Sequence, residues 1–118
     1  LIRVPLYRFD DISIGRSTTQ LVRIHSQYRR ISGAHARLEV QNGSAKLFDV
    51  GSKNGTFVSL NGRFANLPSD YTLSENEWAL LGTKDIKKAV RICYTLHTQE
   101  TIKTADTKTL FGTLETRT

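Results

Sequence analysis

The sequence contains little of what several classes of protein require. It has one cysteine, Cys93, in 118 residues, which excludes an internal disulfide and a cysteine-based zinc cluster. Its longest apolar run, Trp78 to Leu81, is far shorter than the ~18 residues of a membrane helix, so we expect no membrane partner. The first residues also lack the basic and then apolar build of a secretory signal. An intracellular protein is the simpler interpretation.

Charge is distributed unevenly along the chain. The 17 Lys and Arg residues outnumber the 11 Asp and Glu residues, which gives a formal net charge of +6. Residues 1–97 hold 14 of the basic and 8 of the acidic residues, whereas residues 98–118 hold three of each and eight threonines. A length of 118 residues suits one globular domain. We therefore predict a domain at 1–97 and a Thr-rich polar extension at 98–118 that is poorly ordered or loosely docked.

Several short segments alternate apolar and polar residues with a period of two, which is the pattern of half-buried strands. This alternation occurs at residues 11–14, 36–40 and 90–96. Asn-Gly pairs at 42–43 and 61–62 indicate tight hairpin turns, because a type I′ turn needs positive φ at both central residues. Short strands separated by turns in this way predict an all-β sandwich.

Three clusters of small and polar residues lie at the ends of predicted strands. They are Gly15-Arg16-Ser17, Ser32-Gly33-Ala34-His35 and the segment from Asp49 to Thr56. Cations come from Arg16 and Lys53, and directional hydrogen bonds from Ser32, Ser52 and Asn54. No nucleophile–base pair accompanies these groups. Because loops gather at the ends of a sandwich, the clusters indicate a bound anion rather than a catalysed reaction.

The order of these motifs resembles that of a forkhead-associated (FHA) domain: Gly-Arg, then Ser-x-x-His, then Ser-x-Asn-Gly-Thr, then Asn-Gly. The resemblance covers nearly all of residues 1–96. It implies a β-sandwich of about eleven short strands, with functional loops at one end that bind phosphothreonine peptides. Such a domain needs no cofactor, and its partner is a phosphothreonine-containing protein.

The resemblance also implies roles for individual residues. Arg16 resembles the arginine that grips the phosphate, Ser32 the serine that holds it, and Lys53 the residue that completes the phosphate shell. Asn54 resembles the asparagine that hydrogen-bonds the peptide backbone. Gly33 departs from the family, which commonly has Arg, Lys or Asn there, but its backbone N–H remains a donor. Structural residues that shape or tie the loops are matched by Gly15, His35, Gly55 and Asn61.

The leading hypothesis is therefore a phosphopeptide-recognition module in signalling or the DNA damage response, with a nuclear location. An alternative is a dimerisation or scaffolding domain with weak or lost phosphothreonine binding, whose partner is a second copy. The net charge and Arg29-Arg30 suggest nucleic acid, but no basic helix or aromatic–basic strand supports it. We expect no enzyme, because Glu75 and Glu77 have the pattern of a solvated turn and no metal-ligand spacing occurs.

Overall fold

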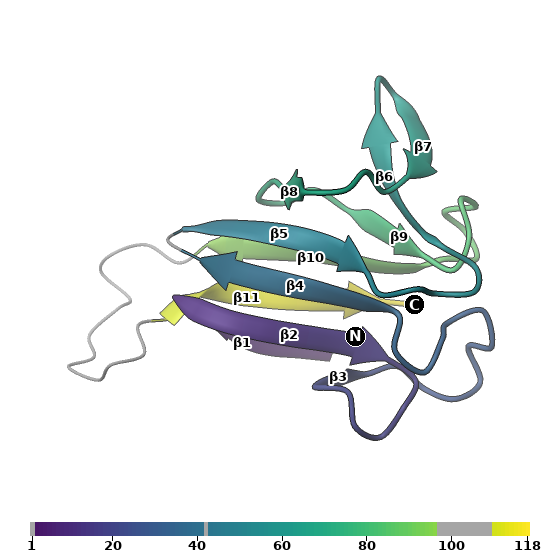
Figure 1. Cartoon of the computed structure of the whole chain (residues 1–118), viewed down its shortest axis with the longest axis horizontal. Helices are drawn as coiled ribbons and strands as arrows, with labels where there is room; N and C mark the ends of the chain where they lie inside the picture. Colours follow the sequence, from purple (N-terminus) through teal and green to yellow (C-terminus); the bar gives the residue numbers. More distant parts are fainter. Residues whose placement is uncertain (1, 42, 97–109) are drawn as a thin grey trace.

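The computed structural model describes residues 2–41, 43–96 and 110–118, which form eleven strands in two sheets (Figure 1). The strands are β1 (Ile2–Tyr7), β2 (Phe9–Gly15), β3 (Val22–Arg23), β4 (Ala36–Gln41), β5 (Ser44–Asp49), β6 (Thr56–Leu60), β7 (Arg63–Asn66), β8 (Tyr71–Leu73), β9 (Ala79–Leu81), β10 (Val90–Leu96) and β11 (Leu110–Arg117). One sheet has the order β1-β11-β10-β9-β6-β7 and the other β3-β2-β4-β5-β8. The predicted all-β sandwich is confirmed. Among the described residues, no helix is long and apolar enough to span a membrane.

The two sheets pack through aliphatic side chains that alternate along the strands. In β4, Ala36, Leu38 and Val40 are buried, whereas Arg37 and Glu39 remain partly exposed. Fully buried side chains reach the same core from both sheets: Leu6, Ile12, Leu47, Leu81, Ile92 and Leu114. Each such side chain contributes about 1.5–3 kcal/mol when it leaves water. Because this core holds the sheets together, the loops at the strand ends are available for binding.

Both predicted Asn-Gly hairpins are present. In the turn between β6 and β7, Leu60 pairs with Arg63, and Asn61 and Gly62 have φ values of 55° and 81°. The hairpin of β4 and β5 has Gly43 with a φ of 81°, while residue 42 lies outside the described residues. The local sequence determines these turns, because Asn and Gly tolerate positive φ at little steric cost.

Strand β11 corrects one sequence prediction. It lies between β1 and β10 inside the six-stranded sheet, and its Leu114 and Thr116 side chains are buried. Leu114 pairs with Val4 on one side and with Tyr94 on the other. The expectation of a poorly ordered or loosely docked extension is therefore wrong for residues 110–117, which belong to the sandwich. Residues 97–109 lie outside the described residues.

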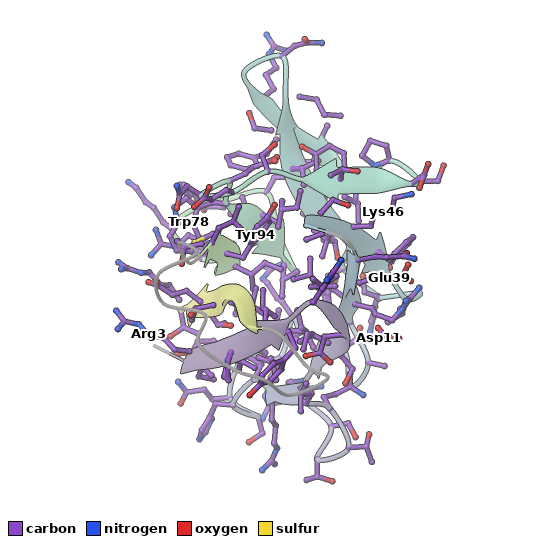
Figure 2. All side chains as sticks on the ribbon, turned by 90° about the vertical axis from the view of Figure 1, so that its left-hand side faces the viewer. Arg3, Asp11, Glu39, Lys46, Trp78 and Tyr94 are labelled. Atoms are coloured by element: carbon purple, nitrogen blue, oxygen red, sulfur yellow. The ribbon has the colours of Figure 1, made fainter. Side chains whose placement is uncertain are left out.

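The outward faces of the two sheets carry charged groups that interact within their own sheet (Figure 2). On the five-stranded sheet, Glu39 of β4 pairs in register with Asp11 of β2 and Lys46 of β5. On the six-stranded sheet, the guanidinium groups of Arg91 and Arg117 lie 5.7 and 5.6 Å from the ring centroid of Trp78. The three motif clusters lie on neither face, but in the loops and strand ends at one end of the sandwich.

Candidate functional site

The three motif clusters meet at one end of the five-stranded sheet. Strand β4 is antiparallel to both β2 and β5, so β4 begins where its two neighbours end. The same end of the sheet, on the right of Figure 1, therefore carries the three loops at residues 16–21, 32–35 and 50–55. The sheet topology thus brings together residues that are far apart in the sequence.

The first two clusters are joined through their backbones. The Arg16 N–H donates to the Ser32 carbonyl, and the Ser17 N–H donates to the Gly33 carbonyl, both at 3.0 Å. A Cβ atom on Gly15 would lie 2.1 Å from the Gly33 carbonyl oxygen, so only glycine permits this close approach. The Gly-Arg motif therefore places Arg16 directly beside Ser32.

His35 lies fully buried between the second and third clusters. Its Nδ1 accepts a hydrogen bond from the Ser32 N–H at 3.0 Å, and its Nε2–H donates to the Gly55 carbonyl at 2.8 Å. Burial lowers the pKa of His35, and it outweighs the opposing effect of the Gly55 carbonyl. The neutral ring therefore ties two loops together, which is the packed, hydrogen-bonded role that the sequence predicts.

The third cluster is stabilised by Asp49, to which the sequence prediction gives no role. Its carboxylate accepts hydrogen bonds from the Ser52 N–H at 2.8 Å, the Ser52 hydroxyl at 2.5 Å and the Thr56 hydroxyl at 2.8 Å. Burial acts to raise the pKa of Asp49, but these hydrogen bonds prevail and the pKa is lowered. Asp followed three residues later by Ser is a turn pattern that could have revealed this network.

The sequence suggests that the Ser52 hydroxyl donates to a ligand, but the structure gives this hydroxyl a different role. Besides its bond to Asp49, its hydroxyl accepts the Gly55 N–H at 3.0 Å. The Gly55 residue, with a φ of 92°, turns the chain so that its carbonyl faces His35. The Ser52 hydroxyl is thus engaged inside the loop, and it shapes the site rather than facing a ligand.

The Arg16 guanidinium is half-buried and held in place by hydrogen bonds, but not all of its N–H donors are used. Its Nε–H donates to the Ile31 carbonyl, and its Nη1 donates to the Ser26 carbonyl at 3.3 Å. A guanidinium carries five N–H donors, so three of them remain for a ligand. Within the described part of the chain Arg16 makes no ion pair, so its positive charge is available as well.

The other predicted binding residues keep free hydrogen-bonding capacity. The Ser32 hydroxyl accepts the Lys53 N–H at 2.9 Å, which leaves the hydroxyl proton to donate. The Asn54 Nδ2 donates to the Arg30 carbonyl at 2.9 Å, and its Oδ1 accepts no hydrogen bond from the described residues. The exposed Gly33 N–H likewise has no acceptor there. Four different kinds of donor or acceptor on one fixed backbone therefore remain unused by the described residues.

The structure brings most of the predicted site residues together, but not all of them. Arg16, Ser32, Lys53 and Asn54 are linked through the hydrogen bonds of Ser32 and of the Arg30 carbonyl. Asn61 does not join this group, because it lies in the turn of the β6–β7 hairpin, which projects from the rest of the sandwich in Figure 1. Its contribution is to the hairpin alone.

The two carboxylates that could be mistaken for a catalytic pair both accept hydrogen bonds from neighbouring groups. Glu77 accepts hydrogen bonds from the Tyr71 hydroxyl and, at 2.9 Å, from the Ser74 N–H. Glu75 accepts the Leu96 N–H at 3.0 Å. Burial, together with Glu77, raises the pKa of Tyr71 to about 12. Glu75 thus fastens the turn to the end of β10, and Glu77 ties the turn to β8 and Ser74, whereas the sequence predicts only a solvated turn.

The fold and these loops define a β-sandwich binding module whose donors converge at one end. The family model of the FHA domain matches residues 12–77, which is more than half of the chain. The chain therefore belongs to the FHA family. FHA domains are generally phosphopeptide-recognition modules, and they are binding domains rather than enzymes.

A similar solved structure agrees with this assignment. The crystal structure of the FHA domain of the CT664 protein from Chlamydia trachomatis is 26% identical in sequence, with a TM-score of 0.52. The alignment covers 69% of this chain and 87% of that one. A comparison with curated proteins gave no significant match. The two proteins therefore share a similar β-sandwich fold.

Proposed function

We propose that this FHA domain binds phosphothreonine-containing protein segments at the end of the sandwich where Arg16 and Ser32 lie. The observation that carries the proposal is a set of unused donors on a backbone that is already fixed by hydrogen bonds and by the burial of His35. A phosphothreonine carries about −1.5 to −2 charges and three acceptor oxygens. A site that need not reorganise loses little conformational entropy when such a group binds.

Each group has a part in the proposed complex. The Arg16 guanidinium, the Lys53 ammonium, the Ser32 hydroxyl and the Gly33 N–H hold the phosphate. The Asn54 Oδ1, which is free in the described structure, accepts an N–H from the peptide backbone beside it. Because Gly33 is exposed and its N–H is free, the lack of a side chain there leaves one donor in place.

A titration with matched peptides tests the proposal. A phosphothreonine peptide should bind, its phosphoserine twin should bind about fourfold more weakly for want of one buried methyl group, and the unphosphorylated twin should not bind. Equal affinity for the phosphorylated and unphosphorylated peptides would reject the proposal. Equal affinity for the two phosphopeptides would reject only the preference for threonine.

The alternative of a dimerisation or scaffolding domain makes a different prediction. It requires that the protein self-associates without peptide, which light scattering measures. It also requires that phosphopeptides bind only weakly, which the same titration measures. The free Gly33 N–H favours the phosphopeptide reader, because the departure from the family at this position removes no backbone donor. A place in signalling or the DNA damage response, and a nuclear location, remain predictions from the family resemblance.

A further inference from the structure

A cluster of arginines surrounds a tryptophan on the outward face of the six-stranded sheet. Arg91 of β10 pairs in register with Arg117 of β11, and their guanidinium groups lie 5.7 and 5.6 Å from the centroid of the Trp78 ring. Arg3 of β1 pairs with Glu115, two positions before Arg117 on the same face. Figure 2 shows Arg3 and Trp78 on the same side of the molecule. We call Arg3, Trp78, Arg91 and Arg117 the arginine–tryptophan patch.

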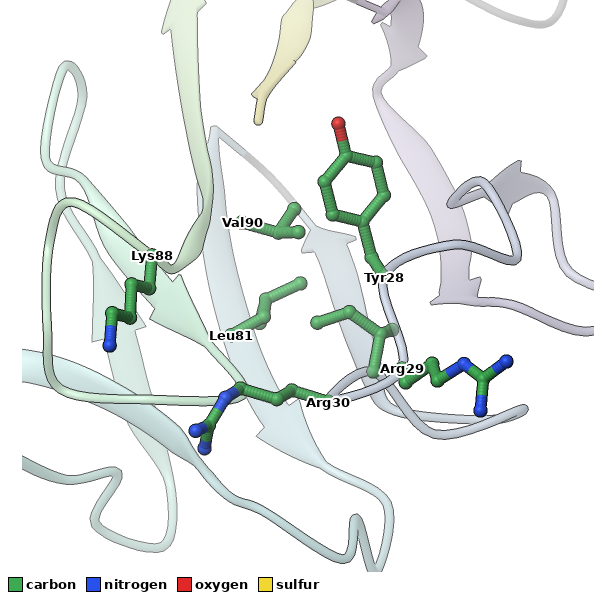
Figure 3. A pocket seen from close by; sticks show the side chains of 7 residues that line it. Tyr28, Arg29, Arg30, Leu81, Lys88 and Val90 are labelled. Carbon is green, nitrogen blue, oxygen red and sulfur yellow. The ribbon is translucent and has the colours of Figure 1, made fainter.

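The alternation of side chains along the strands directs these arginines to solvent. Val90 and its partner Leu81 on β9 are buried, and both line the inward-facing pocket that Figure 3 shows. Successive residues of a strand point to opposite faces, so Arg91 points outward. Thr116 is likewise buried, so Arg117 points outward, where its side chain is 50% exposed. The patch is therefore accessible to a partner from solvent.

The charges of the patch are not balanced within the protein. Arg91 and Arg117 lie directly opposite each other, and like charges in such positions destabilise a sheet. Glu115 accepts the Arg117 Nε–H at 2.7 Å, but neither Arg3 nor Arg91 makes an ion pair with any described residue. The Trp78 ring attracts both neighbouring guanidinium groups, which holds them side by side without removing their charge. An anion bound at the patch would relieve the repulsion.

The arrangement of the cations fits a chain of phosphates better than a single anion. Arg3, Arg117 and Arg91 lie on β1, β11 and β10, which are consecutive neighbours in the sheet. Neighbouring strands are about 4.8 Å apart, so the three arginines form a row across the sheet. A nucleic-acid strand carries a negative charge on each nucleotide, so its successive phosphates can contact the arginines of this row.

The tryptophan favours a single-stranded nucleic acid over an acidic protein segment. The carboxylates of such a segment would use only the positive charge of the patch. An unpaired nucleobase can in addition stack on the partly exposed Trp78 ring or on a guanidinium plane, and such stacking tolerates any base. In a duplex the bases are already stacked on one another, so a single strand is the better ligand.

We propose that the arginine–tryptophan patch binds single-stranded nucleic acid, with its arginines on the phosphates and Trp78 stacked on a base. The sequence predicts no such partner, because no single strand alternates basic and aromatic residues. The patch instead combines residues of three strands with the residue before β9. It lies on the outward face of the six-stranded sheet, whereas the proposed phosphothreonine site is built from loops of the five-stranded sheet. The inference therefore does not depend on the proposed function.

A titration with short oligonucleotides tests the proposal, with the intrinsic fluorescence of Trp78 as the readout. Because Trp78 is the only tryptophan in the sequence, quenching reports on this ring alone. Single strands of DNA and of RNA, about 12 nucleotides long, should bind and quench, whereas a duplex of the same length should leave the fluorescence nearly unchanged. With about three phosphate contacts, affinity should fall about 20-fold between about 50 and about 200 mM salt. The single strand that binds more tightly identifies the preferred nucleic acid.

Matched variants locate the binding, which the anisotropy of a labelled oligonucleotide measures. Arg3→Gln and Arg91→Gln should each weaken binding by about 3- to 10-fold and reduce its salt dependence, because each removes one phosphate contact. Trp78→Leu should weaken binding by at least about fivefold through the loss of stacking. Arg63→Gln is the control, because Arg63 is an exposed arginine on β7, at the opposite edge of the same sheet. The arginine variants should unfold at the same temperature as the parent protein, since the replaced side chains are at the surface.

Several results would overturn the inference. It is wrong if no single strand binds in low salt, or if an oligonucleotide binds without quenching and equally well in Arg3→Gln and Arg91→Gln, because other cations then hold it. Tighter binding of a glutamate-rich peptide would show that the patch serves an acidic protein segment. Displacement of the oligonucleotide by a phosphothreonine peptide at equal concentration would place it in the loop site. The titration with matched phosphopeptides tests the proposed function separately.

Discussion

Two cations on the outward face of the five-stranded sheet, Arg37 and Lys46, have carboxylate partners, whereas the cations at the loop end have none among the described residues. Arg37 lies 3.4 Å from Asp11 and 2.9 Å from Glu39, and Lys46 lies 2.6 Å from Asp70. Arg16, Arg29, Arg30, Lys53 and Lys88 make no ion pair in the described chain. Exposed ion pairs stabilise a fold only slightly, but they remove the charge that would attract a ligand. The unpaired cations keep that attraction at the loop end.

The two regions also differ in what fixes their backbones. The sheet residues are held by regular strand pairing, while the loop residues depend on a few irregular contacts such as those of Gly15 and His35. Substitution of a loop residue that fixes the backbone, such as Gly15 or His35, should therefore act on binding and stability together, and substitutions on the five-stranded sheet should act on stability alone.

The largest effect is expected from Gly15→Ala. The added Cβ would meet backbone atoms of Gly33 at 2.1 and 2.8 Å, which cannot give way without moving the second cluster. We expect a loss of about 3 kcal/mol in the free energy of unfolding, measured by denaturant titration, and a loss of phosphopeptide binding. Gly33→Ala is the control, because its Cβ would meet only the Ser17 Cβ at 3.7 Å. Equal stability of the two variants would contradict the close approach.

Arg16→Ala should weaken phosphopeptide binding by about 10- to 150-fold, because it removes a charged donor from the phosphate. Isothermal titration provides the measurement. Arg16→Lys retains the charge but not the planar fork of donors, so its loss should be intermediate. Arg63→Ala, on the β6–β7 hairpin, serves as a control for net charge. An unchanged affinity in Arg16→Ala would remove this residue from the site.

Thr116→Val should stabilise the protein by about 1 kcal/mol without a change in peptide affinity. The Thr116 Oγ1 is buried and has no hydrogen-bond partner within the described residues, and valine has nearly the same shape without the polar atom. Denaturant titration measures the effect. Thr72→Val on β8 is the matched control, because the Thr72 side chain is exposed. A less stable Thr116→Val protein would show that the hydroxyl is satisfied.

A smaller effect on the free energy of unfolding is expected when the pH is lowered. Because the pKa of His35 is lowered in the folded protein, the unfolded chain binds a proton at a pH where the folded chain does not. The stabilisation is therefore complete above about pH 6.5 and is lost as the pH falls from there toward the lowered pKa of the folded state. Denaturant titrations from pH 7.5 to 5.5 should show this loss, and His35→Gln should reduce it. The same slope in both proteins would exclude His35 as its source.

The sequence is sufficient to predict the loops of the proposed phosphate site, because their signals are local. Gly-Arg, Ser-x-x-His and Asn-Gly-Thr each occupy a few consecutive residues at the end of a period-two segment, so the sandwich itself brings them together. The His35 contacts follow from the same pattern. What the sequence hides is which hydroxyls are used internally, as at Ser52, since donor and acceptor chemistry is the same in either role.

The arginine–tryptophan patch could not be predicted in this way. Its residues lie far apart in the sequence and become neighbours only through the pairing of β11 with β1 and with β10. Strand β11 escaped prediction for a related reason. Its threonines lower the mean hydropathy of the segment, but they favour extended backbone, and its burial depends on neighbours at opposite ends of the chain.

The position of β11 has a consequence for how the protein is made and handled. Strand β1 pairs with β11 alone, so a fragment that stops at residue 97 would leave the first strand without a hydrogen-bonding neighbour and would uncover the edge of β10. Bare strand edges invite pairing between molecules. During synthesis, the first strand must wait for residues 110–117 to leave the ribosome before it can join its sheet. A boundary drawn by composition would thus yield an incomplete domain whose exposed strand edges promote aggregation.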